Sequence, residues 1–226
     1  MKVIILAGGR GTRLPKSAKD IPKALVPIHG KAVLDHQLEL LEKHGLTDVR
    51  LSLGFRADQI IAHIKQSGRD NIEYVIEDEP LGTGGGVCLA AKDLTEDFIV
   101  LNGDVVTDFD FTEMLNRHAP GSPVIVAAWR EDARDFGLLD IVGEKIRAFL
   151  EKPVRPTSGY INAGCYILHP RHFKDVAKES FMLEKDVFPR LAEGGELRTF
   201  IHSGFWQDVG TEMRLAEIRN KKPRIL

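Results

Sequence analysis

The residues best suited to chemistry in this chain are glycines and arginines that directly follow an apolar run at the N-terminus. Gly8, Gly9 and Gly11 stand beside Arg10 and Arg13. Glycine backbones can bring successive N–H groups onto one anion, and guanidinium groups match phosphate oxygens. The segment therefore predicts a phosphate-binding loop, with a tight turn after a buried strand as the alternative interpretation.

Two well-known glycine loops do not match this segment. A P-loop ends in Lys followed by Ser or Thr, whereas Gly11 is followed by Thr12 and Arg13. The dinucleotide-binding fingerprint has a third glycine at the position that Leu14 occupies here. The sequence therefore excludes a P-loop and disfavours a hydride-transfer enzyme.

Two aspartates far apart in the sequence are candidates for a metal site. Asp104 follows Asn102 and Gly103 at the carboxyl end of an apolar run, the edge at which open α/β sheets bind ligands. Asp208 is flanked by aromatic and apolar residues that would half-bury it, so it needs a partner or a cation. Together they would suit Mg²⁺. A helix-capping role is the alternative for Asp104.

Three further motifs carry groups that could bind a phosphorylated substrate. Lys23 follows a proline that restrains the backbone before it, and residues 79–86 form a second glycine-rich segment. The backbone of that segment could meet a base or a phosphate, or it could be a flexible loop. Glu151, Lys152 and Asn162 supply an acid, a cation and an amide, which suits a sugar phosphate.

The elements that must position these residues follow from the apolar pattern. Strands are expected at 3–7, 49–53, 72–76, 98–101, 124–128, 138–142, 146–150, 160–168 and 198–201. Helices are expected at 33–44, 57–65, 87–91, 173–178, 183–193 and 212–219. Alternation in the first half predicts parallel strands with crossover helices. We therefore expect a Rossmann-like, three-layer α/β/α fold of the α/β class with a mixed, mostly parallel sheet.

Composition excludes several functional classes. The 226 residues are 43% hydrophobic and 28% charged with a net charge of −2, as in an ordinary soluble globular protein. A net charge of −2 does not favour non-specific binding to nucleic acid or to a membrane surface. Cys88 and Cys165 form no Cys-x-x-Cys pair, and the N-terminal apolar run is short for a signal peptide. We expect a cytoplasmic protein, with a homodimer as the prior for its assembly.

Taken together, the motifs resemble the sugar-phosphate nucleotidyltransferases, which join a nucleoside triphosphate to a sugar 1-phosphate and release pyrophosphate. The matching segments, in the order of that family, are 6–13, 22–23, 79–83, 102–104, 151–153, 162–164 and 206–210. The resemblance implies one domain over 1–226 of the nucleotide-diphospho-sugar transferase type. Its nucleotide-binding half would be 1–110 and its sugar-phosphate-binding half 111–226.

The resemblance also assigns site residues. It implies catalytic roles for Arg13, Lys23, Asp104, Lys152 and Asp208, with Mg²⁺ held by the two aspartates. The implied nucleotide-binding residues are Leu6, Ala7, Gly8, Gly9, Arg10, Gly11, Thr12, Arg13, Lys23, Glu79, Pro80, Gly82, Thr83, Asn102, Gly103 and Asp104. The implied sugar-phosphate-binding residues are Gly137, Glu151, Lys152, Asn162 and Asp208. The chain departs from the family in Pro15-Lys-Ser-Ala18 and in Ala24, where proline is usual.

Substrate identity rests on likeness to subgroups of the family. The glycine-rich segment at 79–86 and Leu183-Glu-Lys-Asp186 resemble guanylyltransferases that use GTP and D-glycero-α-D-manno-heptose 1-phosphate. Mannose-1-phosphate guanylyltransferases and N-acetylmuramate-1-phosphate uridylyltransferases are the alternatives, and no residue dictates guanine. A nucleotide-sensing module that binds without turnover is the alternative from another class.

Overall fold

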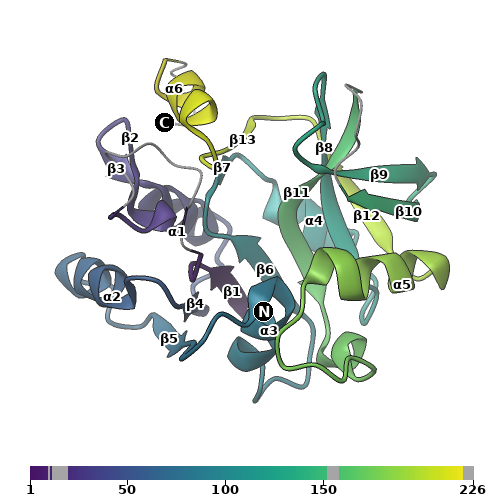
Figure 1. Ribbon diagram of the computed structural model, residues 1–226, viewed down its shortest axis with the longest axis horizontal. Coiled ribbons are helices and arrows are strands. Elements are labelled where there is room, and N and C mark those ends of the chain that lie inside the picture. Colours follow the sequence, from purple (N-terminus) through teal and green to yellow (C-terminus); the bar gives the residue numbers. More distant parts are fainter. Residues whose placement is uncertain (10, 12–19, 152–157, 221–226) are drawn as a thin grey trace.

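The computed structural model describes residues 1–9, 11, 20–151 and 158–220, and a nine-stranded sheet runs through its centre (Figure 1). In spatial order its strands are β5 (Glu73–Ile76), β4 (Val49–Leu53), β1 (Val3–Leu6), β6 (Phe98–Asn102), β11 (Gly159–Leu168), β8 (Val124–Arg130), β12 (Arg198–His202), β10 (Lys145–Glu151) and β9 (Gly137–Val142). The pairs β5–β4, β4–β1, β1–β6 and β12–β8 are parallel, and the other neighbours are antiparallel. Within this sheet β11 and β10 run against the common direction, so the predicted mixed, mostly parallel sheet is confirmed.

Side chains of the central strands alternate between two hydrophobic cores. In β1, Val3 and Ile5 contribute to one core and Ile4 to the other. The first core packs against helices α1 (Val33–Lys43), α2 (Ala57–Gln66) and α4 (Phe111–Asn116), and the second against α3 (Gly82–Ala90) and α5 (Phe188–Glu193). A strand with both faces covered is apolar along its whole length, as β1 is. The three-layer α/β/α arrangement is therefore confirmed.

Helix α1 shows how the sequence specifies one of these layers. Leu34, Leu38 and Leu41 lie on one helix face and are buried against the sheet. The helix ends at Lys43, and Gly45, just after the C-cap residue His44, has a φ of 71° in the left-handed region. The Gly45 N–H donates to the Glu42 carbonyl and the N–H of the next residue to the Leu41 carbonyl. This Schellman motif terminates the helix as the glycine predicted.

A third, smaller core holds the C-terminal helix beside the strand ends. It lies among the hairpin β2 (Pro27–Ile28) and β3 (Lys31–Ala32), the antiparallel pair β7 (Val105–Thr107) and β13 (Trp206–Asp208), and α6 (Glu212–Asn220) (Figure 1). Ile28, Val106 and Leu215 are among its buried residues. This packing brings the two distant segments that contain Asp104 and Asp208 together.

Some expected elements differ from the structure. The helix expected over 173–178 is wrong, because a 3₁₀ turn at Pro170–Phe173 is followed by irregular chain; six residues are too few to nucleate a helix without packing. The helix expected over 183–193 begins with a π-helical turn at Leu183–Val187 before α5. The short elements β7, α4 and β13 were not predicted.

Both cysteines are free thiols. Cys165 is fully buried, whereas Cys88 is partly buried, and burial raises the pKa of the Cys88 thiol to about 11. Neither is therefore a reactive thiolate near neutral pH. Across the described ranges, no helix is long and apolar enough to cross a membrane.

Candidate functional site

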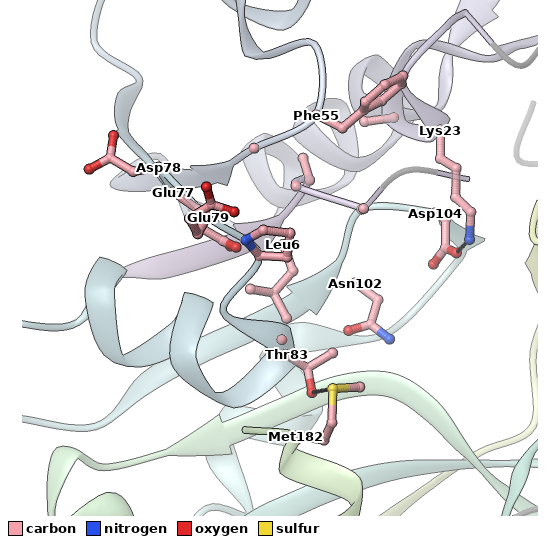
Figure 2. A pocket seen from close by; sticks show the side chains of 18 residues that line it. Leu6, Lys23, Phe55, Glu77, Asp78, Glu79, Thr83, Asn102, Asp104 and Met182 are labelled. Atoms are coloured by element: carbon pink, nitrogen blue, oxygen red, sulfur yellow. Dashed lines mark hydrogen bonds and ion pairs between the residues drawn. The ribbon is translucent and has the colours of Figure 1, made fainter. Parts of the chain in front are cut away.

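A cleft of about 480 Å³ opens at the carboxyl ends of β1, β4 and β6 (Figure 2). Its described lining includes most of the predicted nucleotide-binding residues, namely Leu6, Ala7, Gly8, Gly9, Lys23, Glu79, Pro80, Gly82, Thr83, Asn102, Gly103 and Asp104. Of the remaining predicted residues, Gly11 is described but does not line the cleft, and Arg10, Thr12 and Arg13 lie outside the described residues. The structure therefore brings together the strand-end groups that the sequence separates.

The first glycine segment makes a close approach to its neighbours at Gly8. Its carbonyl accepts a hydrogen bond from the Phe55 N–H, and a Cβ would lie 3.2 Å from the Gly54 nitrogen. A Cβ on Gly103 would lie only 2.7 Å from the Leu6 carbonyl oxygen. Because these glycines have no Cβ, the chain can pass closely at the ends of β1, β4 and β6. Small residues are therefore required at the base of the cleft.

One ion pair dominates the described electrostatics of the cleft. Lys23 lies on a 3₁₀ turn (Lys23–Leu25), and its Nζ is 2.7 Å from Asp104 Oδ2. The two side chains are 20% and 23% exposed, so solvent reaches both. Among the described lining residues, Lys23 alone has a basic side chain. Lys23 is therefore a solvent-accessible cation that an incoming phosphate could engage.

Asp208 comes close to Asp104 because β13 pairs with β7. Asp208 lies opposite Val105 in the register, and the Val209 N–H donates to the Asp104 carbonyl at 2.9 Å. Burial, reinforced by the negative charge of Asp104, raises the pKa of the Asp208 carboxyl. In the described ranges no group of three or more His, Cys, Asp or Glu forms a metal-binding cluster. Two carboxylates alone still suit Mg²⁺, which commonly takes one or two from a protein.

The second glycine-rich segment is not the open loop that one interpretation of the sequence expected. Helix α3 begins at Gly82, and the N–H groups of Gly84 and Gly85 donate to the Phe181 carbonyl. A Cβ on Gly84 would overlap the Phe181 ring, and one on Gly82 would lie 2.5 Å from the Phe181 carbonyl oxygen. These N–H groups therefore have hydrogen-bond partners. Because the glycines lack side chains, the segment 179–182 can pack closely against α3.

Gly84→Ala is expected to destabilise the protein by about 1–3 kcal/mol, because the added methyl group would overpack a filled site. Chemical unfolding measures the loss. Gly9→Ala is the matched control, since a Cβ at Gly9 meets nothing within 4 Å. Adding Phe181→Leu to Gly84→Ala should recover part of the loss, and an unfolding free energy unchanged in Gly84→Ala would contradict the packing role.

The cleft contains residues that the motifs did not identify, namely Ala24, Gly54, Phe55, Glu77, Asp78 and Met182. Glu77 accepts hydrogen bonds from the Leu81 N–H at 3.0 Å and the Ser52 hydroxyl at 3.3 Å, which fixes the turn before α3. Its position just after β5 was a usable signal, because strand ends line such clefts. No such signal existed for Met182, because Met182 lies 99 residues after Thr83, the lining residue that it contacts.

Of the predicted acceptor residues that the structure describes, Gly137, Glu151 and Asn162 do not line this cleft, whereas Asp208 adjoins Asp104. Gly137 begins β9 and pairs with Glu151, while Lys152 lies outside the described residues. Asn162 Oδ1 accepts from the Gly164 N–H, and its Nδ2 donates to the Tyr166 hydroxyl at 3.0 Å. The roles of Gly137, Glu151, Lys152 and Asn162 in binding a sugar phosphate stay predictions.

The two asparagines of the motifs nevertheless share one buried neighbour, Tyr166. The buried Tyr166 hydroxyl contacts the Asn102 side chain as well as that of Asn162. Gly164 lies between them with a φ of 72°, and a Cβ there would come within 2.8 Å of Asn102 Nδ2. Asn102 of the cleft and Asn162 of the predicted acceptor side are thus held in one polar cluster.

Comparisons with known proteins agree with this geometry. The family model described as "Nucleotidyl transferase" matches residues 2–224. Mannose-1-phosphate guanyltransferase from Debaryomyces hansenii is 35% identical over 247 residues, covering the whole chain and 68% of that protein. Mannose-1-phosphate guanyltransferase beta-B from Xenopus laevis is also 35% identical, with the same coverage of both chains.

Solved structures give the same result. HddC from Yersinia pseudotuberculosis, crystallised with GMP-PN, is 33% identical and superposes with a TM-score of 0.85 over 97% of this chain and 98% of its own. A putative glucose-1-phosphate thymidylyltransferase from Bacillus anthracis has the same TM-score at 24% identity, covering 97% and 94% of the two chains. That second likeness supports the fold alone.

Proposed function

The chain belongs to the nucleotidyl transferase family, as a sugar-phosphate nucleotidyltransferase, and from that premise we propose that it transfers a guanylyl group from GTP to a sugar 1-phosphate. The observation that carries the proposal is the meeting of Lys23, Asp104 and Asp208 between the end of β6 and the start of β7. Relatives named for guanylyl transfer and a structural neighbour crystallised with GMP-PN support guanine.

Charge in the cleft also supports guanine. Carboxylates occupy one end and the Lys23–Asp104 ion pair the other (Figure 2). Glu77 is already hydrogen-bonded, whereas Asp78 and Glu79 are exposed and make no side-chain hydrogen bond or ion pair with another described residue. Guanine presents two adjacent N–H donors on one edge, which a carboxylate accepts together. Uracil presents one N–H between two carbonyls, and adenine places an acceptor beside its donor.

Glu79→Gln should reduce the preference for GTP, because an amide cannot accept two donors in parallel. We expect kcat/KM for GTP to fall about 10-fold to 100-fold, equivalent to losing about 1.4–2.7 kcal/mol, with a smaller loss for UTP. Competition assays with the two triphosphates measure the ratio. The Asp78→Asn variant tests the neighbouring carboxylate, and an unchanged GTP-to-UTP ratio in both variants would contradict base recognition by this pair.

We also propose Mg²⁺ as the cofactor, bound by Asp104 and Asp208. Both are hard oxygen donors, and the raised pKa of Asp208 reflects a carboxylate whose charge is disfavoured by burial and by Asp104. A divalent cation would offset both effects. When bound, it supplies charge neutralisation at the phosphate that is attacked.

The residues of this chain then have defined tasks. The attacking group is a phosphate oxygen, largely deprotonated near neutral pH because its second pKa is about 6, so no general base is needed. When the triphosphate enters, the Lys23 ammonium leaves its ion pair with Asp104 and binds a phosphate oxygen. Backbone at the strand ends holds the nucleotide in line with the acceptor. The task of the site is to bring two polyanions together.

The acceptor is the least constrained substrate. Mannose 1-phosphate is supported by the names of the relatives at 35% identity, and D-glycero-α-D-manno-heptose 1-phosphate by the motif resemblance. Purified protein incubated with GTP, UTP or ATP against both sugar phosphates, with and without Mg²⁺, tests the proposal through pyrophosphate release. Release with GTP and either sugar supports it. No pyrophosphate release with any pair of substrates would favour the nucleotide-sensing module.

A further inference from the structure

Arg214, in the first turn of α6, is buried against the candidate metal carboxylate. Its Nη1 lies 3.2 Å and 2.9 Å from the two oxygens of Asp208. Its Nη2 lies 2.7 Å from Asp135 Oδ2. The residue is only 8% exposed. One guanidinium therefore joins two carboxylates from segments far apart in the sequence.

Aromatic packing fixes the same side chain from a third direction. The Phe136 ring lies beneath the guanidinium, with its centroid 4.1 Å from Cζ. Phe136 itself packs edge-on against Trp206, two residues before Asp208. A cation held by two carboxylates and an aromatic face has little freedom to leave. Arg214 thus differs from Lys23, which solvent can reach.

The location of Arg214 is hard to explain by stability alone. The first turn of a helix favours acidic side chains, because the helix dipole is positive there. A buried ion pair gains little net stability over apolar residues of similar size. Asp135 also immediately precedes Phe136 and Gly137, and Gly137 is the first residue of β9 on the predicted acceptor side. The bridge therefore connects Asp208 to the segment that leads into β9.

We propose that Arg214 is a positioning residue that orients Asp208 for the metal and links it, through Asp135, to the start of β9, where the predicted acceptor residue Gly137 lies. This inference rests on the proposed function, since Asp208 is a metal ligand only within it. Orientation of metal-binding carboxylates by a second layer of hydrogen bonds affects metal affinity and activity by about 10-fold to 100-fold. The predicted consequence is that metal binding and acceptor binding both depend on the bridge.

Arg214→Met tests the proposal, because methionine keeps an apolar stem against Phe136 and removes the guanidinium. Mn²⁺ affinity, measured by electron paramagnetic resonance in the presence of GTP, should fall about tenfold. KM for D-mannose 1-phosphate should rise about tenfold, while KM for GTP stays within about twofold. Arg219→Met is the matched control, since Arg219 lies on the same helix and its guanidinium donates hydrogen bonds to the Pro27 carbonyl, away from Asp208.

Two further variants separate positioning from simple structural support. Asp135→Asn should raise KM for the sugar phosphate less than Arg214→Met does, and the double variant should be no worse than Arg214→Met. Arg214→Lys should recover Mn²⁺ affinity but not the KM, because one ammonium group cannot span both carboxylates. An Arg214→Met protein with a lower unfolding temperature but unchanged Mn²⁺ affinity and unchanged KM would overturn the proposal. It would also be overturned if the increase in KM of the double variant equalled the product of the increases in the two single variants.

The metal titration needs no turnover, so it separates the two proposals. A wild-type protein that never releases pyrophosphate would contradict the proposed function, whereas the Mn²⁺ titration of Arg214→Met would still decide whether Arg214 positions Asp208.

Discussion

Replacing Asp104 with asparagine is expected to lower turnover by about a thousandfold while leaving the fold intact. The carboxylate is one of two that would hold Mg²⁺, and an amide keeps its size but loses its charge. Loss of the partly exposed Lys23–Asp104 ion pair is offset by relief of the repulsion between Asp104 and Asp208. We therefore expect the free energy of unfolding to change by less than about 1 kcal/mol.

Steady-state kinetics and chemical unfolding on the same preparation measure both effects. Asp175→Asn is the control, because Asp175 is an exposed carboxylate that pairs with Arg190 away from the cleft. Near-normal turnover of Asp104→Asn in Mg²⁺ would remove Asp104 from the mechanism. A collapse of stability in step with turnover would assign Asp104 a structural role instead.

Replacing Lys23 with methionine should lower kcat/KM for the triphosphate about a hundredfold. The lost charge-assisted hydrogen bond contributes about 1.5–3 kcal/mol, and each factor of ten corresponds to 1.36 kcal/mol. Among the described lining residues no other basic side chain can replace it. Lys23→Arg should recover part of the loss, because it restores the charge with a different geometry.

Titration of GTP binding without an acceptor separates binding from chemistry in this variant. We expect weaker GTP binding in Lys23→Met and unchanged binding of the sugar phosphate. An unaltered Kd for GTP, or a loss that falls mainly on KM for the acceptor, would contradict contact between Lys23 and the nucleotide phosphates.

The central part of the fold was readable from the sequence because local and long-range signals agree there. Continuous apolar runs marked β1 and β6, and the leucine spacing with Gly45 marked the length of α1. Strand ends then located Asn102 and Asp104 in the cleft, since the carboxyl edge of a parallel sheet binds ligands. These predictions needed only periodicity and one topological rule.

Other features depend on packing between distant segments, which a single sequence does not reveal. The glycine-rich segment at 79–86 was interpreted either as backbone that meets a base or a phosphate or as a flexible loop, yet at Gly84 a small residue is required because the Phe181 ring lies against it. β7 and β13 have three residues each, and they depend on pairing with one another and on packing against distant elements. Arg214 carried no motif at all, because its partners Asp208 and Asp135 are set by the tertiary structure.

The central claim is that this cleft joins a guanylyl group to a sugar 1-phosphate. The most direct measurement is ³¹P nuclear magnetic resonance of the protein with GTP, D-mannose 1-phosphate and Mg²⁺, repeated with the heptose 1-phosphate and with the Asp104→Asn variant. We expect one pyrophosphate for every nucleotide sugar formed with at least one acceptor, and almost no product from the variant. GTP left intact with both acceptors, or equal product from Asp104→Asn, would contradict it.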